Sequence, residues 1–379
     1  MAKYDFLIVG AGLFGAICAR LLNDKGYKVL IIEKDSIVGG LAKTKVIDDV
    51  VLYLNGKHIF YTDDKVVWDF VNQYSEFIDY SNYSEMIQKD GKLYRYPIDL
   101  NTISGFSGEI YPEKIRKSIN KDIKTYGSQY NSNLEERAIS EYGFESYDKI
   151  LKPYLEKFWG RECVKLSPYI IEDNKNRYRY NDRYYNYKYV GIPKEGYTKL
   201  VENIIGDDID IMLNTDYFEY RDSLSKNCTY TIFTGPIDRF CKYIYGPLDW
   251  NCLKFELKEE KGSKSNIFGT PVLNIADKDN ALLQLIEHKA FIQEDKEIEK
   301  NYITYVYPDK WDVDKECMFS INNDQTEEIL DKYIEFMKNN FENIIFGGRQ
   351  GMYRNISMAQ SVRCAIDLCN EIIVKESEN

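Results

Sequence analysis

The stretch that decides the fold lies near the start of the chain and reads Tyr4-Asp5-Phe6-Leu7-Ile8-Val9-Gly10-Ala11-Gly12-Leu13-Phe14-Gly15. Residues 4–9 form a short apolar run that ends at a glycine, which is typical of a buried parallel strand. Residues 14–26 carry apolar side chains at helical spacing, and residues 28–33 form a second apolar run. The sequence therefore predicts a β-α-β unit of about 30 residues.

Three glycines in this unit match the GxGxxG pattern of dinucleotide-binding proteins. Gly10 permits a tight turn, Gly12 lets the backbone approach a pyrophosphate, and Gly15 lets the helix pack closely on the strand. The helix N-terminus offers N–H groups and the positive end of its dipole to phosphates. Glu33 ends the second run, where a carboxylate accepts hydrogen bonds from ribose hydroxyls and repels a 2′-phosphate. The pattern predicts a dinucleotide site and disfavours NADP.

Two further glycine pairs favour FAD over NAD. Gly39-Gly40 follows Glu33 closely and allows a second approach of the backbone to the cofactor, as in the flavoproteins related to amine oxidases, which this segment resembles. Residues 344–349 read as a strand that breaks at Gly347-Gly348 before Arg349, and this resembles the second flavin contact of the same proteins. FAD is the expected cofactor.

The composition excludes several other classes. The chain has 379 residues, so we expect about two or three packing units. A net charge of −11 argues against a nucleic-acid surface. Eight scattered cysteines without a CxxC pair, together with two histidines, predict thiols and no metal site. The sequence contains no apolar run of the length that a membrane span needs, and we expect a cytoplasmic protein.

The pattern along the rest of the chain predicts helices over 64–77, from 113 to about 160, over 325–340 and over 357–374. A short hairpin is expected between residues 91 and 97, and short strands dominate from about 190. We therefore expect residues 1–80 and 336–379 to form the two parts of an FAD-binding domain. Residues 81–190 are a mostly helical insertion with a mobile loop near 170–190, and residues 191–335 are a sheet region interleaved with the FAD domain.

Several blocks in the same order along the chain resemble the UDP-galactopyranose mutase family. They are residues 4–16, 56–62, 156–161, 191–200, 234–238, 253–256, 286–289 and 346–349. The resemblance implies an α/β fold: a Rossmann-like FAD-binding domain with a helical-bundle insertion and a twisted antiparallel sheet domain. It also implies an isomerase that interconverts the pyranose and furanose forms of a nucleotide-activated sugar, as in galactofuranose supply for polysaccharide biosynthesis.

In that family the reduced flavin acts as a nucleophile, because its N5 attacks the anomeric carbon. The resemblance therefore implies reduced FAD, a nucleotide-sugar substrate, an external reductant and a homodimer. We expect FAD to be bound by Gly10, Gly12, Phe14, Gly15, Glu33, Lys34, Gly39, Gly40, His58, Gly348 and Arg349.

The resemblance also assigns residues to the substrate. His58 matches a histidine beside the reacting sugar, where it exchanges a proton near neutral pH, and Arg349 and Tyr61 complete the expected catalytic group. The expected substrate-binding residues are Asn82, Tyr154, Trp159, Arg177, Tyr184, Asn251, Gln284 and Tyr353.

The chain departs from the family pattern around the substrate. Where the family pattern has a second histidine, this chain has Tyr61. Lys57 replaces a small alanine, and Asp173 replaces the arginine of a mobile loop. Asn251 and Gln284 replace two further arginines of the family pattern, and Phe319 and Ile356 replace two tyrosines. Each charge-assisted phosphate contact contributes about 1.5–3 kcal/mol, so we expect altered diphosphate binding. The candidate replacements are Lys57, Arg177, Arg179 and Arg183.

Three functions stay open at this point. The first is a mutase for an altered nucleotide sugar. The second is an FAD-dependent oxidoreductase acting on a sugar-like metabolite, because oxidation needs no departing diphosphate. The third is a non-catalytic homologue that acts as a binding partner, which Tyr61 and Asp173 suggest.

Overall fold

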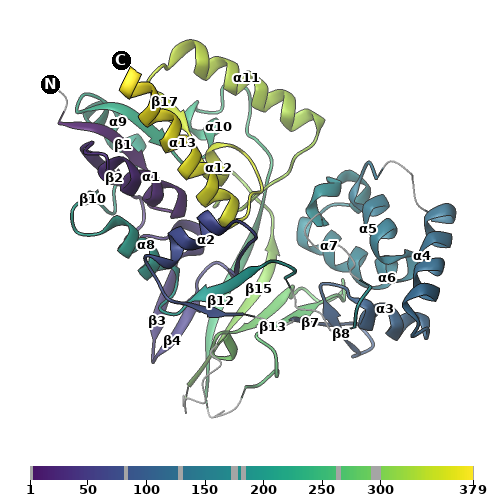
Figure 1. Cartoon of the computed structure of the whole chain (residues 1–379). Coiled ribbons are helices and arrows are strands. Elements are labelled where there is room, and N and C mark those ends of the chain that lie inside the picture. Colours follow the sequence, from purple (N-terminus) through teal and green to yellow (C-terminus); the bar gives the residue numbers. More distant parts are fainter. Residues whose placement is uncertain are drawn as a thin grey trace.

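The β-α-β unit at the start of the chain forms as predicted, with β1 (Tyr4–Val9), α1 (Leu13–Asn23) and β2 (Val29–Ile32) (Figure 1). The computed structural model describes residues 3–80, 84–126, 131–171, 178–180, 185–261, 266–291 and 300–378. Three later strands join the unit: β10 (Asp210–Met212), β11 (Cys228–Phe233) and β17 (Ile344–Phe346). They complete a five-stranded sheet in the order β10-β2-β1-β11-β17, with every pairing parallel.

Both faces of this sheet are covered, which explains the nearly continuous apolar runs of its strands. Phe6 and Ile8 belong to a core shared with α1, α8 (Tyr197–Ile205) and α13 (Met358–Glu378). Leu7 and Val9 point to the other face, where they share a core with α9 (Tyr217–Ser225), α10 (Ile237–Phe240) and α11 (Asp324–Asn340). Alternate residues of one strand thus serve two helical layers.

A second sheet has seven strands in the order β16-β12-β15-β14-β13-β7-β8. Its strands are β7 (Ser84–Ile87), β8 (Leu93–Tyr96), β12 (Trp250–Lys261), β13 (Val272–Ile275), β14 (Gln284–Glu287), β15 (Lys300–Asp309) and β16 (Phe319–Ser320). The family resemblance implies a twisted antiparallel sheet; most pairings here are antiparallel, but the sheet is mixed because β7 pairs in parallel with β13. The hairpin of β7 and β8 therefore extends the sheet from within the segment expected to be mostly helical.

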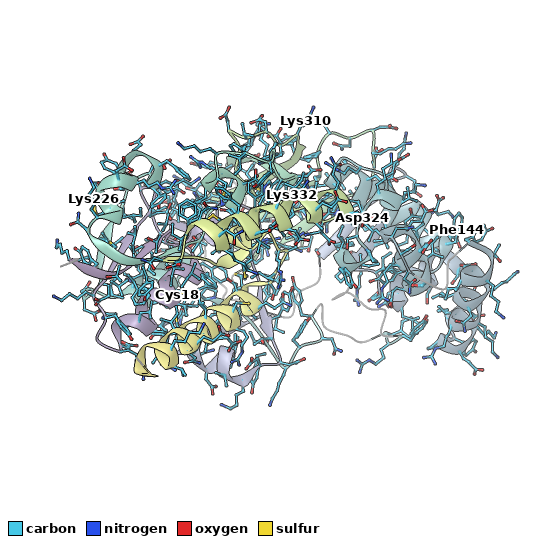
Figure 2. The ribbon with its side chains drawn as sticks, turned by 90° about the horizontal axis from the view of Figure 1, so that it is seen from above. Cys18, Phe144, Lys226, Lys310, Asp324 and Lys332 are labelled. Carbon is cyan, nitrogen blue, oxygen red and sulfur yellow. The ribbon has the colours of Figure 1, made fainter. Side chains whose placement is uncertain are left out.

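The helices of that segment form a separate unit at the end of the second sheet, beyond β7 and β8 (Figure 1). They are α3 (Leu100–Ser107), α4 (Pro112–Tyr126), α5 (Leu134–Tyr142), α6 (Phe144–Ser146), a π-helical turn η2 (Tyr147–Leu151) and α7 (Lys152–Trp159). Figure 2 shows Phe144 in this unit, well to one side of Cys18 in the Rossmann-like part. α7 ends at Trp159, close to the predicted end, and Gly160 follows it with a φ of 62°.

Smaller elements complete the fold. β3 (Thr44–Ile47) and β4 (Val50–Tyr53) form a hairpin, and β5 (Phe60–Thr62), β9 (Tyr189–Pro193) and β6 (Phe77–Asp79) form a three-stranded sheet. The remaining helices are α2 (Lys65–Asn72), α12 (Gly348–Gly351) and the 3-10 turns η1 (Gly40–Ala42), η3 (Cys163–Lys165), η4 (Pro168–Ile171) and η5 (His288–Phe291).

Two stretches differ from the elements predicted for them. The helix expected over 64–77 ends at Asn72, because residues 77–79 pair with β9 instead. The region after 190, where strands were expected to dominate, also contains α8, α9 and α10. In α8, Leu200, Val201 and Ile204 recur on one face and are buried in the core shared with α1.

Within the part of the chain that the structure describes, every helix falls short of the length and apolar character that a bilayer crossing requires.

Candidate functional site

A cavity of about 620 Å³ opens at the carboxyl edge of the parallel sheet and extends to the second sheet. Its position follows from the fold, because ligands of open α/β sheets bind where the strands end. Its volume is that of a typical ligand site. Of the residues predicted for cofactor and substrate, those on its wall are Gly10, Gly12, Phe14, Gly15, Glu33, Lys34, Gly39, Gly40, His58, Tyr61, Gln284, Gly348 and Arg349.

Glycine backbones form one wall of the cavity. A Cβ placed on Gly12 would have Gly40 Cα as its nearest neighbour, at 3.8 Å, so these two turns face each other. Gly15 lies against the strand instead, because a Cβ there would lie 2.1 Å from the carbonyl oxygen of Gly10. Gly12 is also the N-cap of α1, so the positive end of the helix dipole faces this wall. The arrangement suits a pyrophosphate.

Glu33 lies beside this wall and is only 7% exposed. Its Oε2 accepts a hydrogen bond from the Ala11 N–H at 2.8 Å, and its Oε1 accepts one from the Asp35 N–H at 2.9 Å. Burial raises the pKa of this carboxyl, and the two backbone donors oppose the rise. A carboxylate oxygen can accept a second hydrogen bond, so both oxygens keep acceptor capacity for a ribose.

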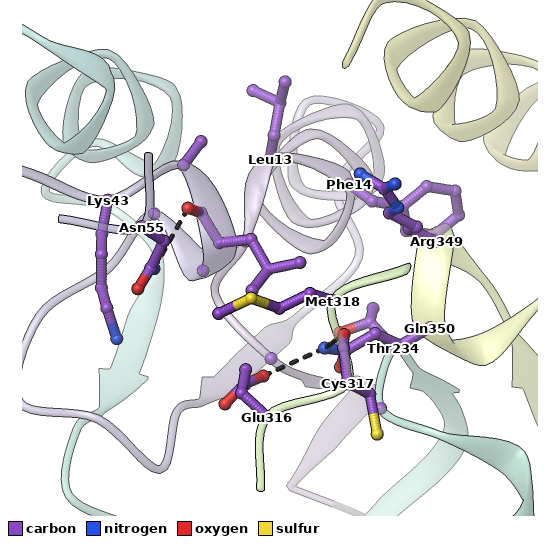
Figure 3. Close-up of a pocket in the computed structure, with 18 of the residues that line it drawn as sticks. Leu13, Phe14, Lys43, Asn55, Thr234, Glu316, Cys317, Met318, Arg349 and Gln350 are labelled. Atoms are coloured by element: carbon purple, nitrogen blue, oxygen red, sulfur yellow. Dashed lines mark hydrogen bonds between the residues drawn. The ribbon is translucent and has the colours of Figure 1, made fainter. Parts of the chain in front are cut away.

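Lys34 lines the cavity, but its ammonium is engaged by the protein. Its Nζ lies 2.8 Å from Glu316 Oε2. The other oxygen of Glu316 accepts a hydrogen bond from Gln350 Nε2 at 3.0 Å, and Figure 3 shows these two side chains joined across the site. Glu316 thus ties the end of β2 to α12, and Lys34 closes the site as well as lining it.

His58 is buried on the cavity wall. Its Nε2 has no hydrogen-bond partner among the residues that the structure describes. Burial, helped by the nearby charge of Arg349, lowers the pKa of the imidazole to about 4, against a weaker contribution from the Leu41 backbone. The ring is therefore neutral at pH 7. A buried nitrogen without a partner among the described residues indicates that a polar ligand binds here.

Arg349 reaches the same region from α12, after the chain turns at Gly348, which has a φ of 73°. Its Nη2 donates to Asn355 Oδ1 at 3.0 Å, and its guanidinium lies 4.9 Å from the ring centre of Phe319. Its Nε is buried without a partner within the described part of the chain. Burial lowers the pKa to about 10, with Tyr61 opposing the change, so the cation persists at neutral pH. Figure 3 shows it beside Phe14.

Tyr61 stands on β5 and packs between other tyrosines. Its ring is stacked on that of Tyr185, with centroids 4.4 Å apart, and the ring of Tyr187 lies at 4.7 Å. Tyr61 and Tyr185 both line the cavity, and Tyr61 interacts electrostatically with Arg349. The structure therefore brings the three predicted catalytic residues together.

The structure places several predicted substrate residues beneath the wall. Tyr154 is buried, and its hydroxyl donates to Asn274 Oδ1 at 3.1 Å and accepts from Gln284 Nε2 at 2.6 Å. Gln284 lines the cavity, yet its amide is also 2.8 Å from Asn274 Oδ1. Asn251 is buried and donates from Nδ2 to the carbonyl oxygen of Phe158 at 2.9 Å. The amides of Asn251 and Gln284 are hydrogen-bonded within the protein, so neither supplies the positive charge of the arginine expected at its position.

Trp159 and Tyr353 also lie off the cavity wall. Trp159 is buried and packs edge-on against Phe319, which does line the cavity. Tyr353 is fully buried, with its hydroxyl 2.8 Å from the carbonyl oxygen of Ile321. Both side chains are packed in the core next to the site and therefore support the cavity wall without lining it. The predictions for Asn82, Asp173, Arg177, Arg183 and Tyr184 lie outside the described residues.

Some residues that line the cavity were not predicted from the sequence. Thr234 follows β11, and its Oγ1 would lie 2.2 Å from a Cβ on Gly10. Thr215 follows β10, and Ser357 and Ser361 lie at the start of α13. The strand-end positions could have been found, because the carboxyl ends of parallel strands supply ligand contacts. Glu316 and Gln350 gave no comparable signal, since their pairing depends on the fold.

Comparisons with known proteins agree with this geometry. The family model described as UDP-galactopyranose mutase matches residues 149–355, and that of an NAD(P)-binding Rossmann-like domain matches residues 8–74. The chain is 31% identical to a probable UDP-galactopyranose mutase of Klebsiella pneumoniae, covering 98% of this chain and 96% of that one. It is 28% identical to the dTDP-fucopyranose mutase of Escherichia coli, covering 98% and 99%.

A solved structure of a reduced UDP-galactopyranose mutase superposes with a TM-score of 0.73 at 13% identity, covering 98% of this chain and 95% of that one, and so shares the fold. Fold and cavity define a dinucleotide-binding protein of the Rossmann-like class. The extent and identity of the matches make the assignment narrower: the chain belongs to the UDP-galactopyranose mutase family.

The fold and the family together imply a flavin cofactor, and the cavity fits one. The facing turns at Gly12 and Gly40 leave room for a pyrophosphate, and Glu33 lies where a ribose would be. The unpartnered nitrogens of His58 and Arg349, among the described residues, lie on the same wall. They suit the polar edge of a flavin and a bound sugar.

Proposed function

We propose that this protein interconverts the pyranose and furanose forms of a nucleotide-activated sugar and requires FAD in its reduced form. The observation that carries the proposal is a single cavity that joins a pyrophosphate-binding turn to His58, Arg349 and Tyr61. Relatives named as mutases for UDP-galactopyranose and dTDP-fucopyranose support the reaction class. An external reductant and a role in polysaccharide biosynthesis belong to the same proposal.

The chemistry that FAD supplies when bound is a nucleophilic nitrogen for the anomeric carbon of the sugar. Glu33 would hold the adenosine end, and the turns at Gly10, Gly12 and Gly40 would hold the pyrophosphate. His58 and Arg349, on the same wall, would then be available to the flavin ring. Orientation of this kind lowers the entropic part of the barrier, because the reacting atoms are already in place.

The three residues around the reacting sugar have distinct parts. Arg349 stays cationic and stabilises negative charge on the leaving diphosphate or on the flavin. His58 is neutral, so its Nε2 forms a hydrogen bond without adding charge, and proton exchange at this atom requires a change in its surroundings. Tyr61 offers a hydroxyl in place of a second imidazole, held in position by the stacked ring of Tyr185.

The test is turnover by the purified FAD-loaded protein, reduced anaerobically with dithionite. UDP-galactopyranose and dTDP-fucopyranose are incubated separately, and the sugar nucleotides are resolved by chromatography. We expect the furanose form of at least one substrate, with no conversion by oxidised protein. Absence of ring exchange with every nucleotide sugar in a wider panel would refute the mutase proposal.

The same experiment separates the alternatives. Bleaching of the oxidised flavin by a sugar-like metabolite, without dithionite, would indicate an oxidoreductase instead. Flavin that is bound but inert toward both kinds of substrate would indicate a non-catalytic binding partner.

A further inference from the structure

Two contacts that depend on the short strand β16 hold the side chain of Arg349. The ring centre of Phe319 lies 4.9 Å from the guanidinium, and Asn355 Oδ1 accepts a hydrogen bond from Arg349 Nη2 at 3.0 Å. Asn355 is fixed in turn by the backbone of Ser320. The Ser320 N–H donates to Asn355 Oδ1 at 3.0 Å, and Asn355 Nδ2 donates to the Ser320 carbonyl oxygen at 2.6 Å.

The two backbone hydrogen bonds determine which end of the Asn355 amide faces Arg349. A backbone N–H requires an acceptor and a carbonyl oxygen requires a donor, so the amide satisfies Ser320 in one orientation only. In that orientation the remaining acceptor capacity of Oδ1 lies at the guanidinium. Arg349 belongs to the described lining of the cavity and Asn355 does not. Asn355 is therefore placed to act on a ligand through Arg349.

Both groups that hold Arg349 are neutral. An amide oxygen and an aromatic ring orient a guanidinium without bringing a negative charge of their own. Arg349 makes no ion pair with any carboxylate that the structure describes. The four carboxylates in the described cavity lining are engaged elsewhere: Glu33 by two backbone N–H groups, and the others in the pairs Asp35–Lys43, Asp216–Arg239 and Glu316–Lys34.

A carboxylate at position 355 would change this arrangement. It would form an ion pair with Arg349, and the pair would offer an anion in the cavity much less net attraction than the cation alone. It would also lack the donor that now binds the Ser320 carbonyl oxygen. The neutral amide thus orients the guanidinium and keeps its charge available.

We propose that Asn355 is a positioning residue, which holds Arg349 toward the cavity and leaves its positive charge to an anionic group bound there. Two groups of the proposed reaction have this chemistry, the diphosphate of the nucleotide sugar and the reduced flavin. The inference rests on the proposed function and adds the residue that controls how strongly Arg349 attracts either anion.

The experiment compares the FAD-loaded parent with Asn355→Asp and Asn355→Ala. Calorimetric titration with UDP, dTDP, uridine and thymidine gives the affinity for the diphosphate, and anaerobic redox titration gives the midpoint potential of the flavin. Asn340→Asp is the matched control, because it adds the same charge at an exposed position at the end of α11, outside the described cavity lining. Flavin absorbance and the melting temperature report whether each variant is folded and loaded.

If the anion is the diphosphate, Asn355→Asp is expected to raise the Kd of UDP or dTDP by about 10- to 100-fold. Asn355→Ala keeps the charge of Arg349 and loses only its orientation, so it should raise the same Kd by about 3- to 10-fold. Asn340→Asp should stay within about 3-fold of the parent. The Kd values of uridine and thymidine should not change in any variant.

If the anion is the reduced flavin, Asn355→Asp should instead shift the midpoint potential to more negative values. Reduction would then place negative charge beside a cation that a carboxylate already neutralises. The two measurements therefore separate the two sources of the anion.

Arg349→Met provides the background that distinguishes positioning from direct contact. In that background Asn355→Asp should change neither the diphosphate Kd nor the midpoint potential, because the cation through which Asn355 acts is gone. An undiminished effect in the Arg349→Met background overturns the proposal, since Asn355 would then act on the ligand without Arg349.

Unchanged diphosphate affinity together with an unchanged potential in folded, loaded Asn355→Asp also overturns the proposal, and ring exchange by the parent would leave the mutase proposal standing. Weaker diphosphate binding or a lower potential in Asn355→Asp supports the role of Asn355. Absence of ring exchange in the parent alongside that result would refute the mutase proposal alone. A loss of affinity for uridine as large as that for UDP contradicts the role of Asn355, because it would show a general disturbance of the site.

Discussion

At the scale of single residues, the second and third glycines of the GxGxxG pattern, Gly12 and Gly15, have different roles. Gly15 serves the protein, because a methyl group there would lie 2.1 Å from the Gly10 carbonyl oxygen. Gly12 serves the ligand, because the nearest protein atom to such a methyl group is 3.8 Å away. The same sequence motif therefore combines a folding constraint with a binding constraint, and the two can be separated by mutation.

We expect Gly12→Ala to fold with a free energy of unfolding within about 1 kcal/mol of the parent apoprotein but to lose FAD, since the new methyl group fills the space of the pyrophosphate. Gly15→Ala should instead destabilise the apoprotein by about 1–3 kcal/mol or more. Urea unfolding of the apoproteins and flavin content of the loaded proteins measure the two effects. Equal losses of stability in the two variants would contradict this division.

The buried histidines predict a pH dependence of stability. The folded-state pKa is about 4 for His58 and about 3 for His288, both below the ordinary value of 6.5 because of burial. The unfolded chain therefore binds more protons below pH 6.5, so stability is complete above that pH and falls toward pH 4.

For His58→Asn, the loss of stability between pH 6.5 and pH 4.5 should be shallower than in the parent by about 1.4 kcal/mol per pH unit. Urea midpoints of the apoproteins across this range give the slopes. His288 is the internal comparison, because its Nδ1 accepts from the Tyr53 N–H and its Nε2 contacts Thr304, away from the cavity. Parallel curves for parent and variant would mean that His58 is protonated in the folded protein.

At the scale of elements, the wall under the substrate region is joined by side-chain amides. Tyr154 of α7, Asn274 of β13 and Gln284 of β14 share three hydrogen bonds of 2.6 to 3.1 Å. The network connects the helical unit to the second sheet. Buried networks of this kind are stabilising only when every member is satisfied.

Tyr154→Phe should lower the free energy of unfolding by about 1–3 kcal/mol, because it removes one acceptor of the Gln284 amide and the hydroxyl that donates to the buried Asn274 oxygen. Thermal unfolding is the measurement, with Tyr169→Phe as the control, since Tyr169 is 74% exposed. A similar small change in both variants would show that the network contributes little. Turnover should also fall in Tyr154→Phe, because Gln284 lines the cavity.

Elements were predictable from sequence where the pattern is local. The β1-α1-β2 unit follows from its apolar runs and glycines. The helix predicted over 64–77 runs too far, because residue 77 belongs to a strand whose pairing partner β9 is more than a hundred positions away in the chain. The site divides in the same way: its glycines and Glu33 stand in a motif, whereas the inward turn of Asn251 and Gln284 depends on Phe158 and Tyr154.

At the scale of the whole molecule, the helical unit at the end of the second sheet carries exposed apolar side chains. Ile110 and Tyr111 are 63% and 58% exposed, and Tyr169 is exposed as well. Exposed apolar groups of this kind favour association. The expected homodimer remains a prediction.

Light scattering after size exclusion should give twice the chain mass of 44.6 kDa. Replacing Ile110 and Tyr111 with serine should shift the protein toward the monomer if this surface is the interface. The flavin content is the control, since the substitution lies far from the cavity wall in sequence and contributes no residue to its described lining. A monomeric parent protein at micromolar concentration would contradict the prediction.

The cavity wall combines Gly10 and Gly12 near the start of the chain with Gly348 and Arg349 near its end. During synthesis a ribosome releases the first turn long before the last strand, β17, can take its place beside β11. A nascent chain therefore presents the pyrophosphate-binding loop without the guanidinium that completes the site. Complete cofactor binding must then wait until residues 344–349 have been synthesised and β17 has paired with β11.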